Sequence, residues 1–591
     1  MKKFFKNVKN IAWLCRPYWK YGKLYLILFI TISVFLAPVK DVIYVFFPEK
    51  VVDLLVSGKS FQYVAVFASI ICGIAFITYL IPCFFFCYFQ RKSVYIDLKI
   101  KRDIYEKALH IDYKYIDNPE YYNKYAWALN EYADQANAAC DFIKNFLQYF
   151  LTITVLLSII ATIGPWILLI EAVQLVLHAL INARENKIKI KKKDELMPIN
   201  RRLSYFHRLF YMKEYSADMK STSLNEFVFT KYEKAGKSNI EIVNRYAKIT
   251  LFLGMLHETI FAVTEFIIIT YLIYNITIGN IAEVGLYITM ILAFYRADSK
   301  LQGFIRLLKT ANELSLNAEK IYTFFDIKSE IEIDKQKKLV PNNEVFSVEL
   351  RNVGFAYENS GFALSNMNIS IKPGEKIAIV GENGAGKSTF IKLLLRLYDV
   401  SNGEILINGN PIKEYDVRAL RKKIGIAFQN PNIYAMTFSE NISLYNEIPE
   451  MELDKISEKF GLKSILEKNN VGYDVELTRE FEEQGIILSG GETQKIALAR
   501  IMTGDFGLLL LDEPSSALDP IAEYKMNELI LGVANKTTTI MVAHRLSTTR
   551  NADRIVLIDN GEIKESGTHD ELMALCGKYY EMFTKQAENY V

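Results

Sequence analysis

The sequence predicts a membrane protein of two parts: an all-α domain with six transmembrane helices, followed by an α/β domain. Three observations lead to this fold class. Hydrophobic residues make up 51% of the 591 residues although 23% are charged, which is more apolar than is usual for a soluble chain. Long apolar runs recur up to about residue 300, and beyond about residue 345 short β-branched runs alternate with helical stretches.

The apolar runs predict six membrane spans, because each is near the roughly 20 residues that cross a bilayer. Lys and Arg are concentrated in the first 23 residues and in the stretches 91–124 and 184–248, whereas the short connections 163–165 and 275–280 have none. By the positive-inside rule both termini are cytoplasmic, and we expect a multi-pass protein of the plasma membrane. The predicted spans are 24–47, 61–90, 142–163, 166–183, 250–275 and 281–295.

Composition also suggests where the domains begin and end. Residues 1–22 combine aromatic and basic side chains without a cleavable signal pattern, so we expect an interfacial helix there. The transmembrane domain is expected over 23–325, with spans that continue as helices into two long cytoplasmic loops. A polar linker at 326–345 then leads to the α/β domain at 346–591. The net charge of +3 implies no nucleic-acid partner. The basic residues are explained by orientation in a membrane, and membrane lipid is an expected partner.

A phosphate-binding loop is predicted at 381–389, "GENGAGKST", between the strand "KIAIV" and a helical stretch. Backbone N–H groups and the start of a helix surround the phosphates in such a loop, and the flanking strand and helix argue against a chance Gly-rich turn. Lys387 would reach the β- and γ-phosphates, and the Ser388 hydroxyl would bind Mg²⁺. The expected ATP-binding residues here are Gly381, Asn383, Gly384, Gly386, Lys387, Ser388 and Thr389.

An acidic pair follows the buried strand "LLLLD". Mg²⁺ prefers carboxylate oxygens, and an attacking water needs a base. We therefore expect Asp512 in the metal shell and Glu513 beside the water. Taken alone, an Asp-Glu pair at a strand end is also compatible with a solvated loop.

The stretch "LSGGETQ" at 488–494, together with these two motifs, makes the chain resemble half of an ATP-binding cassette (ABC) transporter of the exporter type. The resemblance covers nearly the whole chain, and the order of the motifs is far more specific than a phosphate loop alone. It implies an all-α six-helix transmembrane domain of the ABC exporter type fused to an α/β P-loop nucleotide-binding domain. It also implies ATP and Mg²⁺ as cofactors and ATP hydrolysis coupled to transport.

The resemblance implies further roles for individual residues. Tyr357 would stack on adenine, and Gln429 would sense Mg²⁺ and the γ-phosphate. Asp519 would contact a second cassette, and His544 would hold the γ-phosphate as the switch histidine. The catalytic residues are then Glu513, His544 and Gln429, and the metal site is formed by Ser388, Gln429 and Asp512.

A second half-transporter is also implied. In this family, residues equivalent to Ser489, Gly490 and Gly491 complete the ATP site of the opposite cassette with a hydroxyl, N–H groups and a helix N-terminus. One chain therefore cannot build a working site. The intact Glu513 and His544 favour a homodimer, although an intact half can also pair with a different one.

The chain departs from the family pattern at two places. The family often has Gln at the position of Glu492 and Gly-Glu-x-Gly in place of "EEQG" at 482–485, where Glu483 keeps the acidic position that resembles a contact to the membrane loops. Neither change removes a phosphate-, metal- or water-binding group, so hydrolysis is still expected. Short coupling helices are expected near 112–122 and 215–225.

Polar residues inside the spans are the best indication of cargo. Glu171, Gln174 and His178 fall on one face of a helix, and such groups in lipid face protein or a water-filled path. A cavity with several acids suits a small or modified peptide, polar and cationic. The predicted cavity residues are Glu171, Gln174, His178, Glu258, Glu265 and Arg296.

Other interpretations of these residues stay open. The acids can instead pair with Lys40, Arg296 or His178 and only hold the helices together. For the chain as a whole, a multidrug or lipid exporter or flippase is the alternative within transport. An ATP-gated sensor or regulator without net transport is the alternative of another class.

Overall fold

The computed structural model describes residues 2–116, 118–163, 165–278, 284–331, 344–357, 361–444, 448–514, 528, 537–543 and 546–588. The chain forms two compact units. Unit 1 comprises Met1–Lys107 and Asn123–Asp326, and unit 2 comprises Ala108–Tyr122 and Ile327–Val591. The segment 108–122, predicted to be the first cytoplasmic loop, therefore belongs to the same unit as the C-terminal domain, although in the sequence it lies between two apolar helices.

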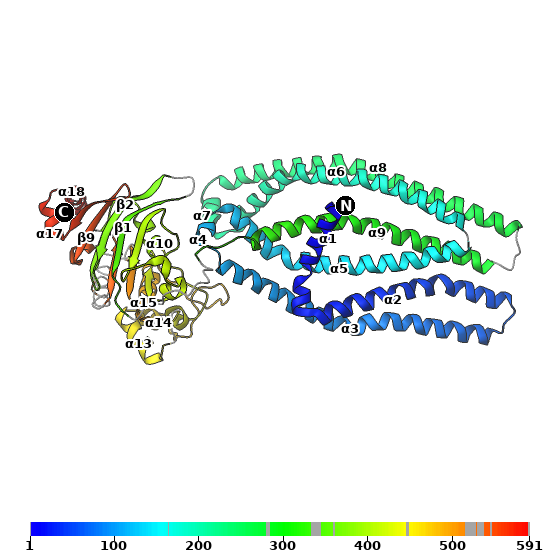
Figure 1. Ribbon diagram of the computed structural model, residues 1–591, viewed down its shortest axis with the longest axis horizontal. Helices are drawn as coiled ribbons and strands as arrows, with labels where there is room; N and C mark the ends of the chain where they lie inside the picture. The colour runs from blue at the N-terminus through cyan, green and yellow to red at the C-terminus, as the bar shows by residue number, and fades with distance from the viewer. Residues whose placement is uncertain are drawn as a thin grey trace. The chain divides into compact units, whose positions relative to one another are not determined.

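Unit 1 is built from long helices, and α6 and α8 lie side by side along much of their length (Figure 1). The 47 residues of α6 and the 55 residues of α8 exceed the roughly 20 that cross a bilayer, so the predicted helical extensions are present. The helices are α1 Lys2–Leu14, α2 Arg16–Val56, α3 Phe61–Leu109, α5 Pro119–Ile163, α6 Pro165–Tyr211, α7 Lys213–Ser221, α8 Leu224–Ile278 and α9 Val284–Phe325. Gly22 interrupts the helical conformation of α2, close to the end of the predicted interfacial helix.

Five of the described helices are long and apolar enough to cross a membrane, namely α2, α3, α5, α6 and α8. They correspond to five of the six predicted spans. The sixth, at 281–295, begins outside the described residues. Because α9 carries Arg296, Asp298 and Lys300 directly after its apolar part, this span stays a prediction.

Five helices of unit 1 share one apolar core. Val45 of α2, Ile160 of α5, Ile167 of α6, Leu272 of α8 and Phe294 of α9 are all buried in it. Many other large apolar side chains of the same helices are exposed. An apolar outer surface on long helices suits contact with lipid.

Unit 2 contains two sheets. The six-stranded sheet has the order β10-β9-β3-β8-β7-β6, and all its strands are parallel except the edge strand β10. The four-stranded sheet, β2-β1-β4-β5, is antiparallel. The strands are β1 Val348–Ala356, β2 Phe362–Ile371, β3 Lys376–Val380, β4 Asn402–Ile407, β5 Asn410–Pro411, β6 Ile424–Ala427, β7 Leu508–Asp512, β8 Thr538–Val542, β9 Arg554–Asp559 and β10 Glu562–Gly567.

The predicted parallel sheet is present, but one run expected to belong to the α/β pattern lies elsewhere. "GEILI" at 403–407 forms most of β4, which pairs with β1 in the antiparallel sheet. A β-branched run alone does not specify which strand it will pair with, because that depends on the tertiary fold.

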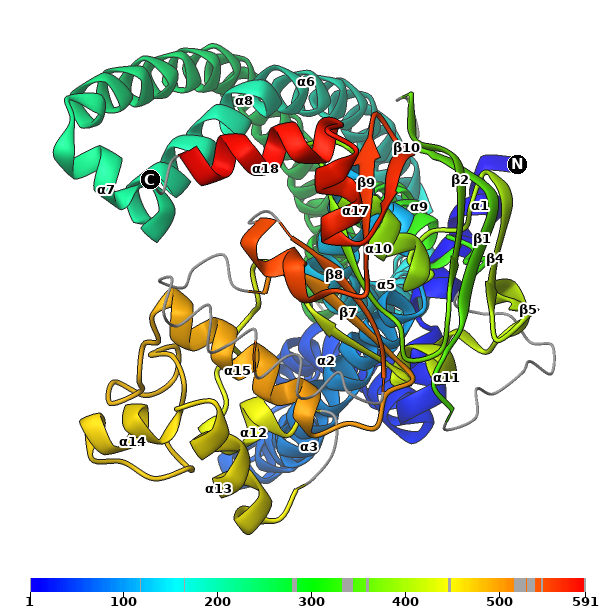
Figure 2. The ribbon, with the colours of Figure 1, turned by 90° about the vertical axis from the view of Figure 1, so that its left-hand side faces the viewer.

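The helices of unit 2 pack on both sheets. α10 contributes to a core shared by the two sheets, and α12 to α15 contribute to a second core together with β6 and β7. Figure 2 shows α12 to α15 grouped together. The helices are α4 Tyr113–Ile116, α10 Lys387–Leu394, α11 Val417–Lys422, α12 Phe438–Ile442, α13 Glu450–Lys459, α14 Lys463–Asn469, α15 Gly490–Met502, α17 His569–Ala574 and α18 Lys578–Glu588.

Candidate functional site

Three sequence motifs meet at one edge of the parallel sheet. β3 pairs with β8, β8 with β7, and β7 with β6, so their carboxyl ends lie at the same edge. Val542 at the end of β8 is in register with Ile379 of β3 and Asp512 of β7. The phosphate loop after β3, the acidic pair at the end of β7 and Gln429 after β6 therefore converge there.

Two glycines let the phosphate loop pass close to neighbouring strands. Gly386 has a φ of +104°, and a Cβ atom there would lie 2.7 Å from the carbonyl oxygen of Ala363 on β2. Gly381 has a φ of +155°, and a Cβ atom there would lie 2.2 Å from the carbonyl oxygen of Ile558 on β9. Only glycine fits both positions without moving backbone atoms. The loop is thus held between β2 and β9.

Lys387 is buried at the start of α10 and is held by the loop itself. Its Nζ donates hydrogen bonds of 2.8 Å to the carbonyl of Gly381 and 3.0 Å to the carbonyl of Glu382. Burial lowers the pKa of the Lys387 ammonium, while the carboxylates of Glu513 and Asp512 act in the opposite direction. A bound phosphate would add negative charge at this position and favour the ammonium form.

Glu513 is joined to Gln429 across neighbouring strand ends. The Nε2 of Gln429 donates a 2.6 Å hydrogen bond to Oε2 of Glu513. Glu513 has a φ of +50°, in the left-handed region that non-glycine residues rarely adopt. Such a conformation costs on the order of 1–3 kcal/mol and is concentrated at functional sites. Its N–H donates to the carbonyl of Val542, which holds the turn in place.

The residues at this edge fit a Mg²⁺–nucleotide complex. Mg²⁺ is usually held by one or two carboxylates together with phosphate oxygens and water. Asp512 supplies one nearly buried carboxylate, and the side chains of Ser388 and Gln429 are exposed beside the loop and the acidic pair. The described part of the chain contains no group of three or more His, Cys, Asp or Glu residues that could hold a metal alone. The phosphates of a bound nucleotide would therefore complete the metal shell.

Tyr357 is attached to the phosphate-loop helix. Its hydroxyl lies 3.1 Å from Oγ1 of Thr389, and its ring packs edge-on against Phe355 and Tyr398. Lys392, on the last turn of α10, lies 5.8 Å from the centre of the same ring. Sequence reasoning identified Tyr357 and Thr389 but missed Tyr398 and Lys392. Lys392 is five residues from Lys387, which is not a same-face spacing on a helix, so no local pattern indicated it.

The first helical turn of α15 is closed by a capping box. The N–H of Glu492 donates to Oγ of Ser489 at 3.4 Å, and the N–H of Ser489 donates to Oε2 of Glu492 at 2.7 Å. The departure from the family pattern at Glu492 thus has a local role, which the Ser-x-x-Glu spacing could have indicated. Ser489 and Gly490 are exposed on unit 2, and Gly491 follows them in the same turn.

Two predicted residues of the ATP site, Asp519 and His544, lie outside the described residues. Ala543, directly before His544, donates from its N–H to the carbonyl of Ile379 at 3.1 Å. The described chain therefore reaches the carboxyl edge of β3 one residue before His544. The roles of both residues stay predictions.

The polar stripe on α6 is buried within unit 1. Gln174 donates from Nε2 to Oδ1 of Asp298 on α9 at 2.7 Å, and the ring of His178 lies 4.6 Å from that of His257 on α8. Glu171 is 4% exposed, and its Oε2 has no hydrogen-bond partner among the described residues. Asp298 was missed from the sequence, although a carboxylate beside an apolar run was a usable signal.

The other predicted cavity residues make contacts of their own. Glu258 is exposed and directly follows His257, which packs on His178, and Glu265 accepts a hydrogen bond from the hydroxyl of Tyr295. Arg296 lies 3.7 Å from Oδ1 of Asp41. Among the described residues, Arg296 thus pairs with Asp41, an acid that was not among the six predicted residues.

The two predicted coupling segments belong to different units. α4, within the first segment, is in unit 2, whereas α7, which overlaps the second, is in unit 1. The segment 108–122 between α3 and α5 is therefore packed with the C-terminal domain.

Comparison with known proteins gives matches over both units. A family model described as ABC transporter matches residues 364–516. The subtilin transport ATP-binding protein SpaT of Bacillus subtilis is 31% identical over 537 residues, which are 88% of this chain and 84% of that protein. The ATP-dependent lipid A-core flippase of Syntrophus aciditrophicus is 36% identical over 270 residues, but these cover only 46% of this chain and 44% of that protein.

Two further matches agree with these. A probable multidrug resistance ABC transporter ATP-binding/permease protein of Bacillus subtilis, YheH, is 32% identical over 313 residues, which are 53% of this chain and 46% of that protein. A solved structure of a bacterial Atm1-family ABC exporter with ATP bound has a TM-score of 0.78 at 20% identity. It covers 95% of this chain and is itself covered to 98%, so it shares the fold of both units.

Proposed function

The chain belongs to the ABC transporter family as a half-transporter of the exporter type, and we propose that two copies of it export a small or modified peptide. It is a multi-pass membrane protein that binds and hydrolyses ATP. Half-transporters of this family work as dimers. Our proposal adds that the two halves are identical, that the membrane is the plasma membrane, and that both termini are cytoplasmic.

One observation carries the choice of a peptide. The relative named for subtilin transport is similar over 88% of this chain, hence over the membrane part as well as the cassette. The relatives named as a lipid flippase and a multidrug transporter match over about half of the chain. The buried acids and amides of α6 and α9 add support, because a polar cationic cargo needs such partners in an apolar bundle.

In the proposed reaction, Glu513 accepts a proton from the attacking water. Gln429 orients that carboxylate through its hydrogen bond and faces the γ-phosphate. Lys387 binds the β- and γ-phosphates, and His544 holds the γ-phosphate. Ser388, Gln429 and Asp512 would hold Mg²⁺, which would neutralise charge on the transferred phosphoryl group.

The ATP site is proposed to be shared between the two copies. Tyr357 stacks on adenine in the copy that supplies the phosphate loop. Ser489, Gly490 and Gly491 of the second copy then cover the γ-phosphate with a hydroxyl and the first N–H groups of α15. Asp519 is placed at the contact between the two cassettes. The exposure of Ser489 and Gly490 on unit 2 supports this arrangement.

Transport would follow from closing and opening of the cassette pair. ATP brings the cassettes together, α4 and α7 pass the motion to the membrane helices, and hydrolysis resets the dimer. The long helical extensions of α3, α6 and α8 support this coupling, since they can move as rigid levers.

Reconstituted vesicles with outward-facing cassettes would test the proposal. We expect ATP-dependent accumulation of a fluorescent cationic peptide, and none with the Glu513→Gln variant. Accumulation of a fluorescent phospholipid or a neutral dye, but not of the peptide, would contradict the proposal that the cargo is a peptide. ATP hydrolysis without accumulation of any of these probes would favour the sensor alternative.

A further inference from the structure

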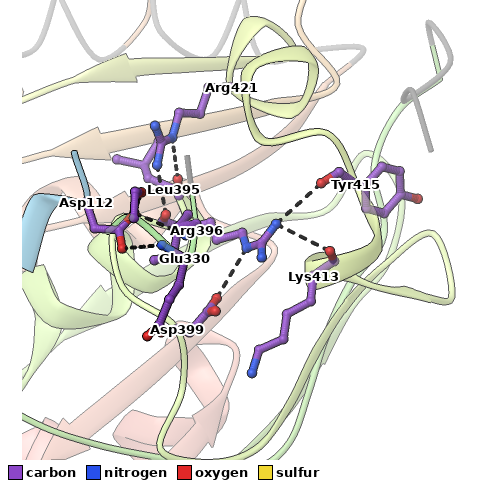
Figure 3. A network of polar contacts seen from close by, with 10 residues as sticks. Asp112, Glu330, Leu395, Arg396, Asp399, Lys413, Tyr415 and Arg421 are labelled. Carbon is purple, nitrogen blue, oxygen red and sulfur yellow. Dashed lines mark hydrogen bonds and ion pairs between the residues drawn. The ribbon is translucent and has the colours of Figure 1, made fainter. Parts of the chain in front are cut away.

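Asp112, directly before α4, holds the start of the segment that leads from α9 to β1. Its carboxylate accepts hydrogen bonds from the N–H of Glu330 at 2.9 Å and of Ile331 at 3.1 Å, and from the hydroxyl of Ser329 (Figure 3). Asp112 is 1% exposed. Because two of these donors are backbone amides, the carboxylate fixes the path of the chain itself.

This contact lies between the places where the chain passes from one unit to the other. The chain passes between the two units after Lys107, after Tyr122 and after Asp326. Asp112 lies in the segment bounded by the first two crossings, and residues 329–331 directly follow the third. The side chain of Asp112 therefore links the segment between the first two crossings to the residues that follow the third.

The next residue, Tyr113, contacts the phosphate-loop helix. Nζ of Lys392, on the last turn of α10, lies 5.6 Å from the ring centre of Tyr113, 5.8 Å from that of Tyr357 and 5.9 Å from that of Tyr398. The rings of Tyr113 and Tyr398 also pack edge-on at 5.7 Å. An ammonium within about 6 Å of aromatic rings is attracted to each of them. Tyr113 thus shares one cation with the proposed adenine-stacking residue.

The end of α10 is fixed to the rest of unit 2. Arg421 donates from Nε to the carbonyl of Leu395 at 2.9 Å and from Nη2 to the carbonyl of Arg396 at 2.8 Å (Figure 3). Arg396 is itself buried, with a φ of +49°, and its guanidinium bonds Asp399 and the carbonyl of Tyr415. The carbonyls of Ile391, Lys392 and Leu393 accept from the N–H groups of residues 395–397, and Arg421 holds the two carbonyls that directly follow the helix. Because both its last turn and the residues after it are bonded, α10 is a short rigid element between the phosphate loop and Tyr113.

We propose that Asp112 and Tyr113 are positioning residues that join the first cytoplasmic loop and residues 329–331 into a single joint on the phosphate-loop helix. Bound nucleotide restrains α10 and Tyr357. Because Lys392 lies beside the rings of both Tyr357 and Tyr113, Tyr113 is restrained as well. Asp112, the residue before Tyr113, then restrains residues 329–331 through its hydrogen bonds. Every chain connection to unit 1 then responds to nucleotide together. The inference rests on the ATP-driven coupling of the proposed function and not on the identity of the cargo.

Hydrogen–deuterium exchange of the full-length protein in lipid nanodiscs tests this without a cargo. In the wild type, Mg²⁺ with the non-hydrolysable analogue AMP-PNP should slow exchange of peptides covering 387–396 and of the peptide covering 329–331. In Asp112→Asn, one carboxylate oxygen becomes an NH2 donor, so the two amides of Glu330 and Ile331 can no longer both be bonded as they are to Oδ2 and Oδ1 of Asp112. Exchange of the peptide covering 329–331 should therefore rise and no longer respond to AMP-PNP. The response at 387–396 should remain.

A second variant separates the two residues of the joint. Tyr113→Leu keeps the Asp112 bonds, so exchange at 329–331 should stay slow without nucleotide but lose its response to AMP-PNP. Lys114→Met is the matched control, because it removes the 3.8 Å ion pair with Glu330 and a 5.3 Å contact of the ammonium with the ring of Tyr115 but keeps the contacts of Asp112 and Tyr113. It should behave as the wild type.

Three results would overturn the inference. The first is a wild-type peptide at 329–331 that ignores AMP-PNP while 387–396 responds. The second is an Asp112→Asn protein that keeps the wild-type response at 329–331. The third is a variant that loses protection over 387–396 as well, which would make Asp112 a general folding residue. Lack of any response at 387–396 in the wild type would instead contradict the ATP site itself.

Discussion

Gln429 and Glu513 are joined by a 2.6 Å hydrogen bond across the carboxyl ends of the neighbouring strands β6 and β7. The amide is the donor and the carboxylate the acceptor, so the bond fixes the orientation of the Glu513 carboxylate beside Gln429. It also connects the residue proposed to sense the γ-phosphate with the residue proposed to activate water. A change at either position should therefore be measurable in hydrolysis.

Replacing Glu513 by Gln keeps the size of the side chain and an oxygen that can accept from Gln429, but removes the base. ATP hydrolysis should fall by roughly 100-fold or more while ATP binding persists. The variant should also accumulate as the closed dimer. Glu404→Gln, a carboxylate-to-amide change at an exposed pair with Arg351, is the matched control and should hydrolyse at the wild-type rate. Near-normal turnover in Glu513→Gln would show that another group is the base.

The shared ATP site can be tested with mixed dimers. Ser489→Ala on one copy and Lys387→Ala on the other should damage the same composite site and leave the second one intact. With both changes on one copy, each site loses one component. The first arrangement should hydrolyse ATP at about half the wild-type rate if the sites act independently, and the second far more slowly. Equal rates in the two arrangements would contradict the shared site.

Ser489 also caps α15, so its removal has a structural cost that needs a control. Losing an N-cap residue typically costs about 0.5–2 kcal/mol of stability. Thr568 forms the same capping box with Glu571 at the start of α17, outside the proposed site. Thr568→Ala should therefore lower the melting temperature of the cassette about as much as Ser489→Ala, with ATP hydrolysis much less affected.

The convergence of the phosphate loop, the acidic pair and Gln429 could be predicted because each of them lies at a strand end. The phosphate loop, Asp512 and Gln429 each follow a short apolar strand, and parallel strands bring their carboxyl ends to one edge. The left-handed backbone of Glu513 could not be predicted, since nothing in "LLLLDEP" requires it. The cluster around Lys392 was missed for a related reason: Tyr113 comes from a loop far away in the sequence.

The polar contacts of unit 1 were harder to predict. Helical spacing correctly placed Glu171, Gln174 and His178 on one face, because that relation is local. Which helix meets that face depends on how the bundle packs, so Asp298 as the partner of Gln174 was not foreseen. From the sequence, several intramembrane acids could have paired with Arg296, and the structure shows that its partner is Asp41.

Asp41 should be structural because it has basic partners. Its Oδ2 lies 2.8 Å from Nζ of Lys300 and its Oδ1 lies 3.7 Å from Arg296, while Asp41 itself is buried. Asp41→Asn leaves both cations without their carboxylate and should lower the free energy of unfolding by about 1–3 kcal/mol. This figure is below that for a fully buried pair because Arg296 is partly exposed. Melting of the purified protein should therefore begin earlier, and basal ATP hydrolysis should fall with it. An unchanged melting temperature would show that the pair contributes nothing to stability.

Glu171 provides the contrasting case, because its buried Oε2 has no hydrogen-bond partner in the described part of the chain. If Glu171 binds a cationic cargo, Glu171→Gln should leave the melting temperature and basal ATP hydrolysis unchanged, since the cassette does not depend on this carboxylate. The affinity for a cationic peptide that stimulates hydrolysis should fall roughly 10- to 100-fold. This corresponds to the loss of a hydrogen bond to a charged group, which contributes about 1.5–3 kcal/mol. Melting, basal and peptide-stimulated hydrolysis should be measured on one preparation beside Asp41→Asn. Early melting would place Glu171 with Asp41 as a structural acid, and unaltered stimulation would show that the stripe does not contact the cargo.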